Sequence, residues 1–253
     1  MNLSRLRAFA ATALLLPVCA FAGQPVDVEI RDRTTGQVLP VYWHGGDRHV
    51  AGEPGHEYEI RIRNGGNGRV LAVTSVDGVN VITGRTASPD QSGYVVESRG
   101  RVEIDGWRKS MDEVAAFYFT DLPDSYAART GRPDNVGVIG VAWFREAPVY
   151  VPMLERESAA SADAAPAPAQ KSGGIREGRA REESRLGTGH GQRLDSGAVY
   201  TQFERASAEP DEIIRIYYDS RRNLVARGVI PKPHHRYARQ QPDPFPQAFV
   251  PDP

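Results

Sequence analysis

The residues with the clearest potential for chemistry lie between positions 84 and 112. Trp107 precedes Arg108, and a guanidinium beside an indole can hold a carboxylate or a sugar ring. Asp90 lies in a turn-like cluster, and Tyr94 follows it closely. We predict a binding surface that uses these four residues. Burial of Trp107 in the sheet is the alternative and the more common outcome, because tryptophan is usually largely buried.

Acids in the same stretch also allow an enzyme. Glycosidases use carboxylates in pairs, and Asp90, Asp105 and Asp112 are candidates by type, with Arg108 beside them. The alternative function is therefore a periplasmic hydrolase that acts on envelope sugar or peptide through acids of the 84–112 loops. The sequence has no G-x-S-x-G elbow and no phosphate-binding loop, and acids beside turns are usually solvated. We therefore assign no catalytic residue.

Three histidines lie close together in sequence. His44, His49 and His56 occur among glycines, at a spacing that matches no common metal-ligand pattern. A solvated loop is expected there, with no metal ion and no other cofactor. A carrier of a metal or a small ligand that uses this loop is a third class of function.

The N-terminus has the pattern of an export signal. Two arginines precede an apolar run over 8–18, and a small-x-small sequence ends at Ala22. We predict a signal peptide over 1–22 with cleavage after Ala22, and a periplasmic or secreted protein. A lipoprotein attached through Cys19 is the alternative, which the proline and valine before that cysteine disfavour.

The charge of the chain is close to balanced. The formal net charge is −1 at pH 7, with 31 basic and 32 acidic residues. Such a balance gives no general attraction to nucleic acid or to an anionic membrane surface. We expect no nucleic-acid partner and no transmembrane segment, because no stretch after the leader is apolar enough to span a bilayer.

Residues 23–152 have the pattern of one β-rich domain. Apolar and charged residues alternate over 26–30 and 57–63, which predicts strands with one wet face. The stretches 113–119 and 136–144 are apolar on both faces and predict central strands. Turn-forming residues separate these runs at short intervals. We predict an all-β fold, an antiparallel β-sandwich.

Two glycine-containing turns are predicted inside this domain. Asp77 and Gly78 separate two strand-like runs, and this pair suits a type I′ turn that places Val76 opposite Val79. Backbone geometry thereby explains Asp77 without any chemical role. The glycine-rich stretch 65–68 is predicted as a hairpin loop.

The composition changes after residue 152. Residues 153–196 are rich in alanine, proline, serine, glycine and mixed charge, which predicts a flexible, disordered linker. Strand-like runs return over 197–231 and predict a C-terminal β-hairpin unit, with a short helix over 219–227 as the alternative to its last strand. So small a unit rarely folds alone, so we expect it to dock on the sandwich or on an envelope protein partner. Residues 232–253 are predicted to be an extended, proline-rich tail.

Several sequence blocks resemble a group of exported Gram-negative bacterial proteins with no settled activity. The blocks are VLAVTSVDGVNVITG, DQSGYVV, IDGWRKS, EVAAFYFT, DSYAARTGRPDNVGVIGVAWF, LGTGHG and YYDSRRNLVARGVIP. The resemblance implies a signal peptide, a β-rich domain and a low-complexity insertion before a final ordered piece. It carries no catalytic residues. It also implies that Gly187 to Gly191 are more than a spacer.

The function expected from these observations is a non-enzymatic binding or assembly role in the periplasm or envelope. A rigid β scaffold and a tethered final segment occur without any catalytic signature. A tethered segment can complete a sheet edge within its own chain or on a neighbouring protein.

Overall fold

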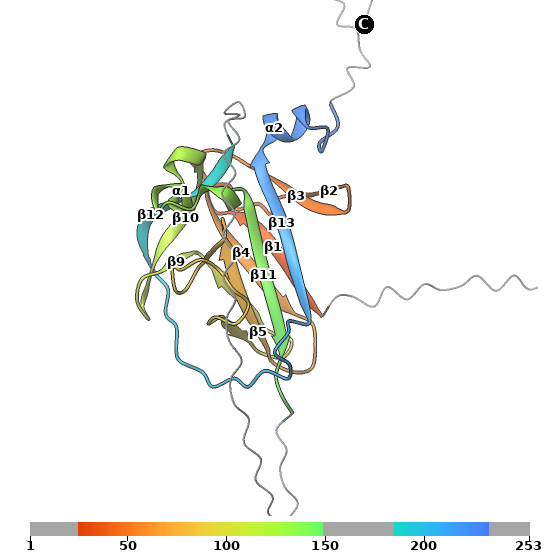
Figure 1. Ribbon diagram of the computed structural model, residues 1–253, viewed down its shortest axis with the longest axis vertical. Helices are drawn as coiled ribbons and strands as arrows, with labels where there is room; N and C mark the ends of the chain where they lie inside the picture. The colour runs from red at the N-terminus through yellow and green to blue at the C-terminus, as the bar shows by residue number, and fades with distance from the viewer. Residues whose placement is uncertain (1–24, 149–184, 233–253) are drawn as a thin grey trace, which may run out of the picture.

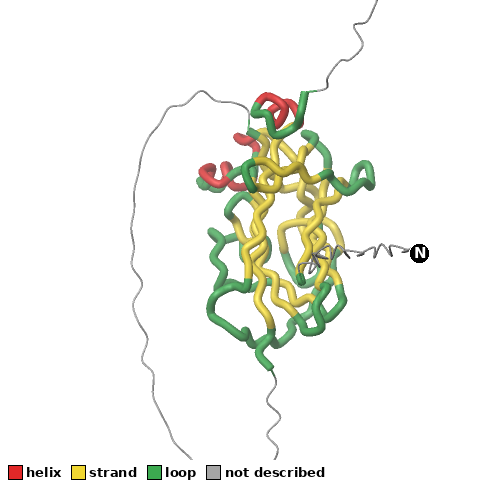
Figure 2. The backbone as a smooth tube through the Cα atoms, turned by 90° about the vertical axis from the view of Figure 1, so that its right-hand side faces the viewer, coloured by secondary structure: helices red, strands yellow, loops and turns green. Residues whose placement is uncertain are grey.

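Two β-sheets pack face to face in the computed structural model, which describes residues 25–148 and 185–232 (Figure 1). The predicted all-β sandwich is confirmed. The side view shows the strands in two layers, with the helices gathered at one end (Figure 2). The predicted signal peptide, the linker residues 153–184 and the tail from 233 onward lie outside the described residues.

The first sheet has the order β1-β4-β10-β12, and β8 and β9 pair with β4 and β10. Every pair in this sheet is antiparallel. Its strands are β1 (Val26–Asp32), β4 (Glu57–Asn64), β8 (Arg101–Ile104), β9 (Gly106–Arg108), β10 (Glu113–Asp121) and β12 (Leu186–Asp195).

The second sheet has the order β2-β3-β13-β11-β5-β6, and β7 pairs with β5. One pair, β3 with β13, is parallel, so this sheet is mixed. Its strands are β2 (Val41–His44), β3 (Asp47–Gly52), β5 (Val70–Val76), β6 (Val79–Asn80), β7 (Tyr94–Val96), β11 (Val138–Arg145) and β13 (Glu212–Ser220).

Short helices cover one end of the sandwich (Figure 2). They are α1 (Tyr126–Arg129), α2 (Arg221–Ala226) and the 3-10 turns Leu122–Asp124 and Pro133–Asn135. Ser125 and Ser220 cap α1 and α2 by accepting a backbone N–H with their hydroxyls. Among the described residues, no helix is long and apolar enough to cross a membrane.

The core forms because the alternating strands turn their apolar side chains inward. Along β1 the valines and the isoleucine are buried, while the charged residues between them are more exposed. Stacked aromatic rings fill the centre, with Tyr58 lying 4.3 Å from Phe119 and 5.3 Å from Phe117, measured between ring centroids. These three side chains are fully buried.

The C-terminal part of the chain differs from its prediction. Residues 186–195, which were assigned to the linker, form β12 along β10. The stretch implied by the resemblance to be more than a spacer therefore lies in a strand. The predicted hairpin unit over 197–231 is also wrong, because β13 lies in the middle of the second sheet, between β3 and β11. A helix, α2, follows it, as the alternative over 219–227 proposed.

The strand expected near 199–206 does not form. The segment connects β12 of the first sheet to β13 of the second. It forms an isolated β-bridge between Arg205 and Glu146. Phe203 packs against an apolar cluster on the outer face of the second sheet. The segment 199–206 contains residue types that favour strands, but here they pack on the surface of a sheet. A local sequence pattern does not distinguish such packing from strand pairing.

One of the two predicted turns is confirmed and the other is wrong. Asp77 and Gly78 have φ angles of 52° and 73°, and Val76 pairs with Val79 as a type I′ turn requires. The glycine-rich stretch 65–68 is not a hairpin loop. It joins β4 to β5, which belong to different sheets, so it crosses the sandwich.

Candidate functional site

Trp107, a predicted binding residue, lies inside the sandwich. Trp107 is only 3% exposed, and its indole N–H donates to the Gly189 carbonyl on β12 at 3.1 Å. The ring packs edge-on against Phe117 and at 4.7 Å from the Tyr126 ring. Burial, the alternative considered for this residue, is therefore its position in the fold.

The structure brings Tyr94 and Arg108 together. Arg108 Nε donates to the Tyr94 hydroxyl at 3.2 Å, and the guanidinium carbon lies 5.7 Å from the Tyr94 ring centroid. The same guanidinium also donates to the backbone carbonyl and hydroxyl of Ser196. Burial raises the pKa of the Tyr94 hydroxyl, and the hydrogen bond from Arg108 opposes that shift. Arg108 thus fastens β7 and β9 to the chain that leaves β12.

Asp90 belongs to a different part of the surface. It is exposed, and the hydrogen bond from Ser88 holds the pKa of its carboxyl below the usual value. The turn around it is held by Arg205, whose guanidinium donates to the Pro89 and Gln91 carbonyls at 3.0 and 2.8 Å. Within the described ranges, no recorded contact joins Asp90 to the pair formed by Tyr94 and Arg108.

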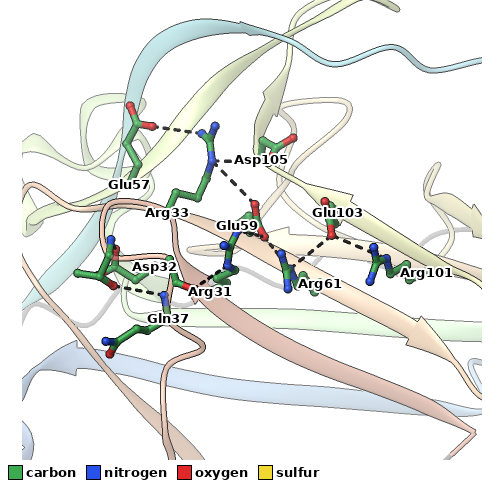
Figure 3. A network of polar contacts seen from close by, with 12 residues as sticks. Arg31, Asp32, Arg33, Gln37, Glu57, Glu59, Arg61, Arg101, Glu103 and Asp105 are labelled. Atoms are coloured by element: carbon green, nitrogen blue, oxygen red, sulfur yellow. Dashed lines mark hydrogen bonds and ion pairs between the residues drawn. The ribbon is translucent and has the colours of Figure 1, made fainter.

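Asp105, a candidate acid of the hydrolase alternative, joins a network of charges on the outer face of the first sheet (Figure 3). Its carboxyl lies 3.9 Å from Arg33 Nε. Burial raises its pKa above the usual value, aided by the charges of Glu59 and Glu103 and opposed by that of Arg33. Asp112 is exposed, and its backbone N–H donates to the Ser110 hydroxyl at 3.2 Å. The structure therefore does not bring these acids together as a catalytic pair.

Glu59 on β4 is the centre of that network (Figure 3). Its side chain is 6% exposed, and its carboxylate lies 2.6 Å from Arg61 Nε, 3.4 Å from Arg31 Nη1 and 3.9 Å from Arg33 Nε. Arg31 lies on β1, Arg61 lies on β4, and Arg33 directly follows β1. Charged residues alternate with core residues along both strands. The outer face of this sheet therefore carries a network of acidic and basic side chains that neutralise one another.

The three histidines have separate surroundings. His44 and His49 lie 6.3 Å apart between ring centroids, and His49 stacks on Tyr217. His56 instead contacts the Asp32 carboxylate with Nδ1 at 2.7 Å. No cluster of three metal-ligating side chains occurs in residues 25–148 and 185–232.

A buried polar hub links the two sheets, and the sequence pattern gave no sign of it. The Tyr218 hydroxyl donates to the Asp77 carboxylate at 2.5 Å. Because a hydroxyl has one proton, the Tyr218 oxygen accepts from Thr188, and the Thr188 oxygen in turn accepts from Tyr58, both at 2.7 Å. Asp77 also accepts the N–H groups of Gly137 at 2.9 Å and Thr188 at 2.8 Å. Burial raises the pKa of Asp77 to about 6, although these hydrogen bonds oppose the shift.

Two clefts lie at opposite ends of the sandwich. The first, of about 740 Å³, is bounded by the end of β13, the start of β12 and α2, and we call it the arginine cleft after Arg185, Arg222 and Arg227 in its wall. The second, of about 530 Å³, lies where β4 ends and β13 begins. Neither is lined by a residue of the 84–112 loops.

The β2–β3 hairpin projects from the side of the second sheet (Figure 1). Trp43 on β2 is 65% exposed, and Arg48 on β3 covers its ring at 5.2 Å from the centroid. Val41, two residues before it on the same strand, is also exposed. Two exposed apolar side chains therefore lie close together on β2.

Comparisons of the chain with protein-family models, with curated proteins and with solved structures find no match.

Proposed function

We propose that this chain is a non-enzymatic binding or assembly protein of the bacterial envelope, which captures an extended segment of a partner protein at the edge formed by β2. The observation that carries the proposal is the exposed Trp43 on an edge strand. Tryptophan is enriched among the residues that dominate binding energy, and an unpaired strand edge is a template for another strand.

The geometry of β2 suits this kind of pairing. In the part of the chain that the structure describes, β2 pairs only with β3, so its other backbone edge is open. Val41 and Trp43 alternate along β2 and share one face. Arg48 beside Trp43 adds a cation. The partner segment is therefore an extended strand with alternating apolar side chains and a carboxylate that reaches Arg48.

The C-terminal segment is a less suitable capture element than the sequence indicated. β13 is hydrogen-bonded on both sides within its own sheet, by β3 and β11. A strand with two neighbours has no free edge to offer a partner. The assembly role thus moves from this segment to the hairpin edge.

The hydrolase alternative has weaker support. It requires acids of the 84–112 loops to converge in a cleft, as the carboxylate pairs of glycosidases do. Neither described cleft contains one of these acids, and Asp105 is paired with Arg33 outside them.

The test is cross-linking of the tagged chain in envelope fractions, with a Trp43→Ser, Val41→Ser double variant beside the wild type. The control is Val199→Ser, Tyr200→Ser, which removes apolar groups that are at least as exposed, from another loop. We expect the partner to be lost with the hairpin variant and kept with the control. A partner that binds all three chains equally would refute the proposal.

A second readout uses the fluorescence of Trp43. Trp107 and Trp143 are buried, so a shift of emission on addition of the purified partner reports Trp43. A blue shift in the wild type that Trp43→Phe abolishes is the expected result, whereas unchanged emission on binding would place the contact elsewhere.

A further inference from the structure

The arginine cleft carries an excess of positive charge. Arg185 enters from the start of β12, whereas Arg222 and Arg227 enter from α2 and the residue after it. Neither Arg185 nor Arg222 has an acid within 4.0 Å anywhere in the described ranges. All three arginines line the same cleft, and Asp219 is the one acidic residue in its lining.

Asp219 does not cancel this charge, because structural contacts already occupy it. It is 7% exposed, and its Oδ1 accepts the Ser220 N–H at 2.7 Å, the Asn223 side-chain amide at 2.8 Å and the Leu186 N–H at 3.4 Å. Its Oδ2 lies 3.6 Å from Arg227 Nη1. The carboxylate joins β12 to α2 and thereby fixes the two walls from which the arginines extend.

The second cleft provides an internal comparison. Its two arginines are each matched by an acid, because Arg69 pairs with Glu146 and Arg145 Nε donates to Asp211 at 2.7 Å. The arginines of the second cleft, at the opposite end of the sandwich, therefore neutralise neighbouring acids. In the arginine cleft only Arg227 lies near an acid, Asp219, so the guanidiniums of Arg185 and Arg222 keep their donors available.

We propose that the arginine cleft binds a phosphate-bearing ligand through Arg185, Arg222 and Arg227. The planar guanidinium fork matches the oxygens of phosphate two at a time, and a group with more than one negative charge suits three cations better than a single carboxylate does. None of the residues that line this cleft belongs to the β2–β3 hairpin, and the site adds a second, chemically different ligand to the protein.

The walls of the cleft are held in place before any ligand arrives. The Tyr217 ring stacks on His49 with 5.5 Å between centroids, and the Tyr218 hydroxyl is bound to Asp77. Ordering of these groups therefore costs little upon binding, which favours affinity.

The experiment measures pyrophosphate binding to the full chain by calorimetry at low ionic strength, with sodium chloride of matched ionic strength as the blank. The variant is Arg185→Gln, Arg222→Gln. The control is a double variant of the outer face of the first sheet, Arg63→Gln, Arg101→Gln, which removes the same charge from two highly exposed positions. Thermal melts verify that all three chains are folded.

We expect the cleft variant to bind pyrophosphate at least about tenfold more weakly than the wild type, since each lost contact is a hydrogen bond between charged groups. The control should bind as the wild type does. An equal loss in both variants would show general electrostatic attraction and overturn the assignment.

Two sources of phosphate can be separated in the same proteins. Sedimentation with phosphatidylglycerol vesicles, compared with phosphatidylcholine vesicles, tests a lipid headgroup. Vesicle binding that the cleft variant loses identifies a membrane source, and pyrophosphate binding without vesicle binding identifies a soluble one. If neither probe binds the wild type, the cleft is not a phosphate site.

Discussion

Tyr58 and Glu59 are neighbours on β4, yet their side chains enter two different polar clusters. Tyr58 points between the sheets and joins the hub of Thr188, Tyr218 and Asp77. Glu59 points outward and contacts three arginines (Figure 3). Both side chains are buried, one by the opposite sheet and one by the arginines that surround it.

The comparison teaches how position decides what a polar cluster does. The hub receives groups from β4, β12, β13, the β5–β6 turn and the residue before β11, so it specifies which distant segments meet. The outer network joins β1, β4 and the segment around β8, which already pair through their backbones. The hub is shielded from water, so the loss of one of its hydrogen-bonding groups leaves its partners unsatisfied and destabilises the fold. In the outer network water can replace part of the lost contacts.

The largest effect is expected from Asp77→Ala. The substitution leaves the buried N–H of Thr188 and the partly buried N–H of Gly137 without an acceptor, and it places alanine at a positive φ. We expect a loss of about 4 kcal/mol in the free energy of unfolding, measured by urea denaturation. Asp77→Asn, which keeps one carbonyl and tolerates this backbone, should lose less. An Asp77→Asn variant as stable as the wild type, beside a destabilised Asp77→Ala, would show that turn geometry and not the hub is responsible.

The pH dependence of stability is the second test. The pKa of Asp77 is about 6 in the folded chain and 3.8 as an ordinary value, so the folded state binds more protons between these limits. Stability from this group is therefore present below about pH 4 and falls by about 3 kcal/mol as the pH rises to about 6. Asp32, whose pKa is lowered, acts in the opposite direction.

The contribution of Asp77 is isolated by subtracting the stability curve of Asp77→Asn from that of the wild type. A difference that does not change between about pH 4 and 6 would contradict the assignment of this titration to Asp77.

A smaller effect is expected from Glu59→Ala. Removal of the carboxylate leaves three guanidiniums facing one another, but each is exposed enough to take up water. We expect a loss of about 2 kcal/mol at low salt that shrinks at high salt, because the repulsion is screened. Denaturation at two salt concentrations measures it, and a salt-independent loss would show that packing dominates.

The smallest effect is expected from Tyr58→Phe. Thr188 keeps Tyr218 as its partner, so only one hydrogen bond is lost and the ring stack remains. We expect a loss of about 1 kcal/mol. If this loss equalled that of Glu59→Ala at low salt, the contrast between the two clusters would not hold.

Much of the fold could be predicted because strand patterns are local. Alternation over 26–30 predicted β1, and the pair Asp77-Gly78 predicted a type I′ turn. The site was harder. Of the four predicted binding residues, the structure joins Tyr94 and Arg108, buries Trp107 and leaves Asp90 in a separate turn. No sequence pattern predicted the arginine cleft, because its arginines come from separate segments whose local composition is ordinary.

The sequence by itself determined the β-class of the fold, the positions of most strands and the backbone geometry at Asp77. These depend on residue types within a few positions of one another. Only the tertiary structure decided that β13 enters the middle of a sheet, that β12 pairs with β10 and that Asp77 is buried against both segments. Such contacts join residues at least 65 positions apart, and their energy depends on burial and on partners that a local pattern does not contain.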